Sequence, residues 1–221
     1  MKTIFLFLIT GFEEIEALAT VDVLRRAGLP VRTVSLTDER TVTGSHGIPV
    51  VADGLFEETD FGLAEMLVIP GGTPAFDSHE GLKREVQAFY DKGGRVAAIC
   101  ASPMVLGGLG ILRGRRATCY PGFEKYLSGA ILATDKAAVV DGNVITGRGP
   151  GLTLDFALTL VEVLAGEAKR HEVASQLLVG WRRGDRCGND VYYIELCAVS
   201  TDEDGDVVDV ESIAKTEYYY I

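Results

Sequence analysis

Cys100 is the residue of this sequence that is best placed to do chemistry. It follows the apolar run 96–99 and comes shortly before Ser102 and Pro103. Pro103 can open a helix, because the first turn of a helix does not use the N–H that proline lacks. The pattern predicts a tight strand-to-helix turn with a thiol at its tip. We expect the oriented N–H groups of that helix to stabilise a thiolate and to lower the thiol pKa.

The alternative is that Cys100 is simply a small buried hydrophobic residue, as free cysteines often are. Two local features favour a nucleophile. Ala98 and Ala101 leave room for a crowded turn, as the small residues around the serine of a nucleophile elbow do. The N–H of Ala101, which is next in the chain, could face an oxyanion that forms on a substrate.

Two glycine-containing loops are further candidates. Pro-Gly-Gly at 70–72 ends a short apolar strand, and Gly71 and Gly72 allow a backbone N–H to approach a reacting carbonyl. Gly-Arg-Gly-Pro-Gly at 147–151 precedes a helix and could bind an anion with Arg148. A glycine-rich turn that merely caps the helix explains the second pattern equally well.

Three glutamates begin the first predicted helix. Glu13 and Glu14 are expected to be solvated acids that complement the helix dipole. Glu16 is the one that we expect to point into the site. Burial can keep a carboxylic acid protonated, and the acid can then donate a hydrogen bond that favours the Cys100 thiolate.

A histidine base is poorly supported by this sequence. His46, His79 and His171 are each expected at the surface rather than beside the thiol. A cysteine peptidase or amidase, which needs such a base, is therefore the weakest of the enzymatic interpretations.

The elements that must position these residues are strands alternating with helices. Strand-like runs predict a mostly parallel sheet with helices on both faces, an α/β fold. Ligands of such folds sit at the carboxyl ends of the strands, where the candidate loops lie. The predicted strands are 4–9, 31–36, 66–69 and 96–99, a hairpin is predicted around 139–146, and the helices are 13–27, 82–90, 152–164 and 168–178.

The chain is expected to divide into a domain at 1–181 and an acidic extension at 182–221. The extension holds ten acids and four bases. Two runs rich in Val, Ile and Tyr flank the turn-like sequence 201–206, which predicts a β-hairpin.

Composition narrows the possible partners and location. The net charge of −11 argues against nucleic acid, and no run reaches the roughly 18 apolar residues of a membrane span. The four cysteines form no Cys-x-x-Cys pair and no histidine lies near them in sequence, so no metal site is expected. Residues 1–11 are interpreted as a buried strand rather than a signal peptide, and the location as the reducing cytoplasm.

Several stretches together resemble the ThiJ/PfpI superfamily, in the branch of the Parkinson-disease-associated deglycase and the bacterial YajL type. The resemblance covers about residues 1–180. It is carried by GFEEIEA (11–17), VDVLRRAG (21–28), VIPGG (68–72), AAICASP (97–103), TCYPGFE (118–124) and GRGPGLTLDFAL (147–158).

This resemblance implies a flavodoxin-like three-layer sandwich and a homodimer with the first helix near the interface. By position, Cys100 matches the reactive cysteine and Glu16 its partner, while Gly72 and Ala101 match the backbone donors around it. Tyr120 stands where the human member has a pocket histidine, so the role of that histidine does not transfer. Ala101 also departs from the Cys-His pair of the protease-like branch.

The resemblance implies a glyoxalase III-like or deglycase-type enzyme. Its substrate would be a small reactive 2-oxoaldehyde such as methylglyoxal, or a glycated group, and it would need no metal or organic cofactor. The alternative from another class is an oxidative-stress sensor or redox-regulated chaperone, in which the same thiol is oxidised rather than turned over.

Overall fold

The computed structural model describes residues 2–180, 192–201 and 207–218. The chain forms two compact units, Met1–Val179 and Gly180–Ile221. Each is described by itself.

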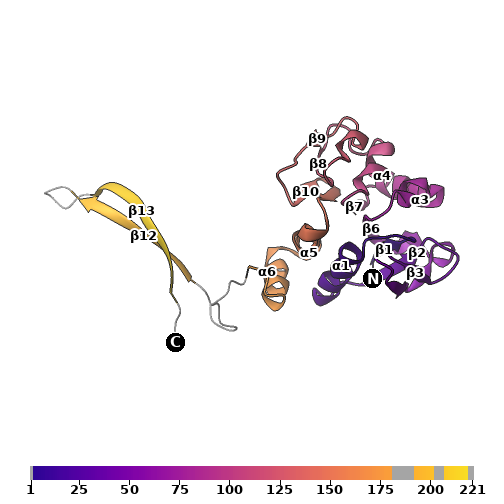
Figure 1. Cartoon of the computed structure of the whole chain (residues 1–221), viewed down its shortest axis with the longest axis horizontal. Coiled ribbons are helices and arrows are strands. Elements are labelled where there is room, and N and C mark those ends of the chain that lie inside the picture. Colours follow the sequence, from indigo (N-terminus) through magenta and orange to yellow (C-terminus); the bar gives the residue numbers. More distant parts are fainter. Residues whose placement is uncertain (1, 181–191, 202–206, 219–221) are drawn as a thin grey trace. The chain divides into compact units, whose positions relative to one another are not determined.

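The first unit is built on a seven-stranded sheet (Figure 1), which confirms the predicted α/β class. The spatial order is β10-β11-β7-β6-β1-β2-β5, and every neighbouring pair is parallel except the hairpin β10-β11. The strands are β1 (Thr3–Leu8), β2 (Val31–Ser35), β5 (Gly54–Leu55), β6 (Ala64–Ile69), β7 (Arg95–Ile99), β10 (Ala138–Asp141) and β11 (Val144–Gly147).

Helices cover both faces of this sheet. Helix α1 packs against α5, and α5 packs against α6, while α3 and α4 contact β7. Figure 1 places α1 and α5 on one side of the sheet and α3 and α4 on the other. The helices are α1 (Glu14–Arg26), α2 (Ala75–Ser78), α3 (Glu80–Asp91), α4 (Pro103–Gly108), α5 (Thr153–Ala165) and α6 (Glu167–Gln176).

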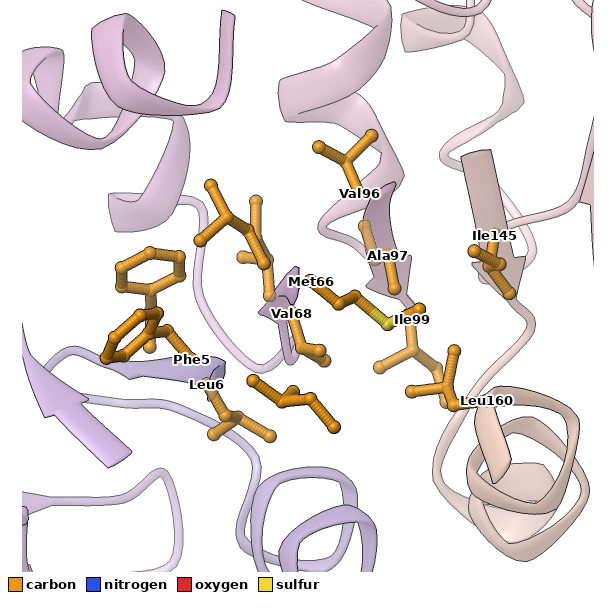
Figure 2. Packing of buried hydrophobic residues seen from close by; sticks show 14 of the residues in the cluster. Phe5, Leu6, Met66, Val68, Val96, Ala97, Ile99, Ile145 and Leu160 are labelled. Carbon is orange, nitrogen blue, oxygen red and sulfur yellow. The ribbon is translucent and has the colours of Figure 1, made fainter. Parts of the chain in front are cut away.

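The core lies between the central strands and these helices. In Figure 2, Val68 of β6 and Ile99 of β7 lie on the same side of the sheet as Leu160 of α5. All three are at most 1% exposed. The central strands are apolar on both faces because helices cover both faces, so their sequences run as continuous hydrophobic stretches.

The strand order reverses direction at β1, which lies between β2 and β6 in the sheet. From β1 the chain moves to β2 on one side, and later returns to β6 on the other side of β1. Helices then leave the two neighbouring strands in opposite directions, which opens a crevice at their carboxyl ends. In doubly wound folds this is where ligands bind.

Smaller elements decorate the sheet. The ribbon β3 (Thr41–Thr43) and β4 (Pro49–Val51) is antiparallel, and β8 (Arg116–Ala117) pairs with β9 (Ile131–Leu132). Short 3-10 turns occupy Phe56–Glu58, Phe61–Leu63, Glu124–Tyr126 and Pro150–Leu152. Among the described residues, none of the helices has the length and apolarity of a membrane span.

The described part of the second unit is an antiparallel pair, β12 (Tyr192–Thr201) and β13 (Val207–Tyr218), in agreement with the predicted hairpin. The predicted turn at its centre, 202–206, lies outside the described residues.

Candidate active site

Cys100 stands on the tight turn between β7 and α4 that the sequence predicts. Its φ angle is 65°, in the left-handed region that side chains other than glycine rarely adopt. The Cys100 N–H donates to the carbonyl of Gly147 at 3.0 Å, and the Ser102 N–H donates to Ile99 at 3.1 Å. The turn is thus fixed at both ends, at the carboxyl edge of the sheet.

Hydrogen bonds join four loops at the carboxyl ends of strands, 11–16, 70–74, 100–103 and 147–151, into one region. Loop 11–16 meets loop 70–74 where the Glu13 N–H donates to the Gly71 carbonyl at 2.9 Å. Loop 70–74 meets the cysteine turn where the Ser102 hydroxyl donates to the Pro70 carbonyl at 2.5 Å. The bond from Cys100 to Gly147 attaches the fourth loop. The site therefore lies at the crevice between β1 and β6.

Glu16 lies beside Cys100, separated from it by Gly71. The Glu16 side chain is fully buried, and its Oε2 accepts the Gly71 N–H at 2.7 Å. A Cβ added to Gly71 would lie 2.7 Å from the Glu16 Oε2, 2.7 Å from the Cys100 Cβ and 3.1 Å from its sulfur. Glycine at 71 is therefore what allows the thiol and the carboxyl to share one small space.

Burial dominates the protonation of this pair. It raises the pKa of Glu16 to about 7, while the hydrogen bonds with Cys100 and the Gly71 N–H limit the increase. Burial also raises the pKa of the Cys100 thiol, and the negative charge of Glu16 raises it further. The carboxyl is consequently the first of the two groups to lose its proton.

The expected lowering of the Cys100 pKa by the helix is wrong. The N–H of Ala101 does favour the thiolate, but desolvation and the Glu16 charge outweigh it. Helix α4 has only six residues, so its dipole is small. The geometry instead suits Glu16 as a base for the thiol, because its pKa near 7 matches the working pH of such a group.

Ala101 and Gly72 both lie in the loops around the thiol: the Ala101 N–H contacts Cys100, and Gly72 lies against the loop that contains Glu13. Gly72 has φ of 101°, and a Cβ there would lie 2.4 Å from the Glu13 nitrogen. Only glycine can bring the two loops this close. Within residues 2–180, the N–H of Gly72 donates to no backbone acceptor.

Tyr120 and Arg148 lie next to the turn but line a separate hollow. The Tyr120 N–H donates to the Cys100 carbonyl at 2.8 Å, and Arg148 reaches the Cys119 carbonyl at 3.5 Å. Both side chains line a cavity of about 280 Å³ with Pro121 and residues 149–152. Neither Cys100 nor Glu16 lines this cavity. The side chains of Tyr120 and Arg148 therefore line a hollow that is separate from the thiol pair.

Glu13 and Glu14 are not solvated, contrary to the sequence prediction. They are 8% and 5% exposed. Glu13 caps α1, because its Oε2 accepts the Glu16 N–H at 2.7 Å. Glu14 accepts the His46 N–H at 2.7 Å and a hydroxyl hydrogen bond from Ser45 at 3.1 Å, so the β3–β4 ribbon covers the start of the helix.

His46 is exposed as predicted, yet it belongs to this buried cluster. Its Nδ1 lies 2.8 Å from the Glu14 Oε2, and this contact raises the pKa of His46. Hydrogen bonds from His46 and Ser45 in turn lower the pKa of Glu14 to about 2, against the opposing effect of burial. Ligand atoms of Glu13, Glu14 and His46 lie within 4.8 Å of one another, the one grouping among the described residues with spacing suited to a metal.

Sequence reasoning missed the capping role of Glu13 and the hydroxyl of Ser102. Glutamate is not among the residues that are preferred at an N-cap, so the sequence carries no clear signal of the cap at Glu13. The bond from Ser102 to Pro70 joins residues 32 apart in the chain, and no local pattern announces it.

The fold and site define a class: a doubly wound α/β protein with a cysteine on the turn after a central strand, paired with a buried glutamate. Comparison with known proteins gives the family. Residues 2–163 match the model of the DJ-1/PfpI family, and the chain belongs to it.

Individual relatives agree with this assignment. Protein DJ-1 homolog B of Arabidopsis thaliana is 37% identical over 179 residues, which are 79% of this chain but 41% of that protein. The chain therefore spans less than half of this relative's length. The glutathione-independent glyoxalase DJR-1.2 of Caenorhabditis elegans is 34% identical over 172 residues, 75% of this chain and 89% of the worm protein.

A solved structure has the same fold. The DJ-1 superfamily protein STM1931 from Salmonella typhimurium, solved as a cysteine-to-alanine mutant, matches with a TM-score of 0.76 and 35% identity. The match covers 82% of this chain and all of the bacterial one.

Proposed function

We propose that this protein is a cofactor-independent glyoxalase or deglycase that uses Cys100 as its nucleophile on 2-oxoaldehydes. The observation that carries the proposal is the placement of a buried Glu16 against Cys100 across Gly71. A thiol, a carboxyl with pKa of about 7 and nearby backbone donors are the groups that the reaction needs. The worm relative, which is named as a glutathione-independent glyoxalase, supports the same activity.

The proposed reaction begins when Glu16 takes the thiol proton and Cys100 sulfur adds to the aldehyde carbon. The oxygen of that carbon takes a proton from Glu16, which gives a hemithioacetal. Glu16 then removes the hydrogen from the former aldehyde carbon, which leaves an enediol, and returns it to the neighbouring carbon. The hydroxyl proton of the former aldehyde carbon moves to the oxygen of the neighbouring carbon, so that the adduct becomes the thioester of a 2-hydroxy acid. Water hydrolyses the thioester, so that the net reaction adds one water to the 2-oxoaldehyde and yields a 2-hydroxy acid.

Methylglyoxal consumption without added glutathione tests this function. Wild-type protein should form lactate, Cys100→Ser should form none, and Glu16→Gln should lose about 10²- to 10⁴-fold in rate because it cannot accept a proton. Cys119→Ser is the matched control, since Cys119 is a second free and buried cysteine. Full activity of Cys100→Ser would refute the proposal.

A redox role is the second candidate. Cys100 is 9% exposed whereas Cys119 is 1% exposed, so Cys100 is the more accessible of these two thiols. If peroxide oxidises Cys100 selectively and methylglyoxal is not consumed, sensing replaces turnover as the better interpretation.

The expected setting is a homodimer in the reducing cytoplasm. Cys100 and Cys119 are both free thiols. Ile15 and Leu18 of α1 are 57% and 39% exposed, and they offer an apolar surface on the helix that is expected near the dimer interface.

A further inference from the structure

The peptide group between Pro70 and Gly71 is held at both of its polar ends. Its carbonyl oxygen accepts the Ser102 hydroxyl at 2.5 Å. Its N–H donates to the Glu16 Oε2 at 2.7 Å. The peptide is trans, so the C=O and N–H point in opposite directions within the peptide plane, and Ser102 and Glu16 lie at opposite edges of this rigid unit.

Every group in this chain of contacts is buried. Ser102 is 1% exposed, and Glu16 is fully buried. Hydrogen bonds in such surroundings polarise one another: a hydroxyl that donates to the carbonyl makes the N–H of the same peptide a stronger donor. The second carboxyl oxygen, Oε1 of Glu16, has no hydrogen-bond partner among the described residues. The Gly71 N–H is therefore the backbone group that holds the Glu16 carboxyl in place. Ser102 in turn holds the peptide group to which this N–H belongs.

We propose that Ser102 is a positioning residue, which holds the Glu16 carboxyl against Cys100 through the Pro70–Gly71 peptide group. Ser102 does not touch the reacting atoms. It sets the plane of the peptide, and the peptide sets the direction and strength of the one hydrogen bond from the backbone to the carboxyl. The catalytic consequence rests on the proposed function, but the positioning itself does not.

The first test is the pH dependence of Cys100 alkylation by iodoacetamide, with mass spectrometry to identify the site. A weaker Gly71 N–H bond stabilises the charged carboxyl less, so Ser102→Ala should move the midpoint of this profile upward by about half a pH unit. The titratable groups that act on Glu16 are Cys100, from the turn after β7, and Glu13, from its own helix. Ser102→Ala leaves both in place, so the shift reports on the peptide.

The matched control is Ser35→Ala. Ser35 is also fully buried, and its hydroxyl donates to a backbone carbonyl, that of Glu39, at 2.6 Å. Ser35 lies at the end of β2, and its side-chain hydrogen bonds go to Thr37 and Glu39. Its removal should cost similar stability and leave the alkylation midpoint unchanged.

The second test combines Ser102→Ala with Glu16→Gln. If Ser102 acts through Glu16, Ser102→Ala should change the labelling rate of Cys100 in the wild-type background and have no further effect in the Glu16→Gln background. In methylglyoxal turnover, Ser102→Ala should lower kcat roughly fivefold and leave KM nearly unchanged.

The outcomes separate this inference from the proposed function. An unchanged midpoint in Ser102→Ala overturns the inference, as does an equal shift in Ser35→Ala or an undiminished effect in the Glu16→Gln background. A shifted midpoint in a protein that does not consume methylglyoxal supports the positioning role and refutes the glyoxalase.

Discussion

Gly71→Ala is the change that most directly tests the packing of the thiol pair. The new methyl group would lie 2.7 Å from both the Cys100 Cβ and the Glu16 Oε2, distances that unstrained carbon atoms do not adopt. The backbone itself tolerates alanine, because φ of Gly71 is not in the left-handed region. The expected damage is therefore steric and local to the site.

The size of the effect follows from these contacts. Overpacking a tight interior by one methyl group costs about 1–3 kcal/mol. For a unit of this length, that corresponds to a fall of roughly 3 to 10 °C in Tm. Pushing the carboxyl and the thiol apart by about 1 Å should reduce methylglyoxal turnover by about 10²-fold.

The assays are thermal unfolding, Cys100 alkylation and methylglyoxal consumption, each performed beside Gly108→Ala. Gly108 is exposed on α4, and a Cβ there would meet one atom within 4 Å, an Asp77 oxygen at 3.5 Å. The control should keep wild-type stability and activity. If Gly71→Ala also keeps wild-type stability and activity, then the absence of a side chain at Gly71 is not what lets the Cys100 thiol and the Glu16 carboxyl lie so close together. The geometric basis of the mechanism is then refuted.

Two further predictions concern pH and assembly. Since burial raises the pKa of Glu16 from 4.5 to about 7, the unfolded chain releases this proton before the folded protein does. Wild-type stability should therefore fall relative to Glu16→Gln as pH rises from about 4.5 to about 7, by about 2–3 kcal/mol in total. Urea midpoints at several pH values measure this, and a constant difference between the two proteins would contradict it. Ile15→Glu should convert a micromolar dimer into a monomer in light scattering, because it places a charge on the exposed apolar face of α1; a wild-type protein that is already monomeric would remove the homodimer from consideration.

The parts of the site that the sequence could predict are local or follow from strand ends. The turn at Cys100 depends on an apolar run, small neighbours and a proline, all within the stretch 96–103. The meeting of four loops follows from parallel strands, whose carboxyl ends share one edge.

The parts that could not be predicted depend on contacts distant in the chain. Glu14 looks like an ordinary first-turn acid until the turn of the β3–β4 ribbon covers it with Ser45 and His46. The raised pKa of the Cys100 thiol depends on how completely the surrounding loops exclude water, which the helix pattern alone does not reveal.

The left-handed backbone at Cys100 has an evolutionary consequence. A φ of 65° costs a cysteine about 1 kcal/mol that a glycine would not incur. If the thiol had no task, substitution by glycine would relieve this strain without a loss of function. The strain at Cys100 therefore fits the reactive role that we propose for this thiol, and a Cys100→Gly protein would keep the fold without the chemistry.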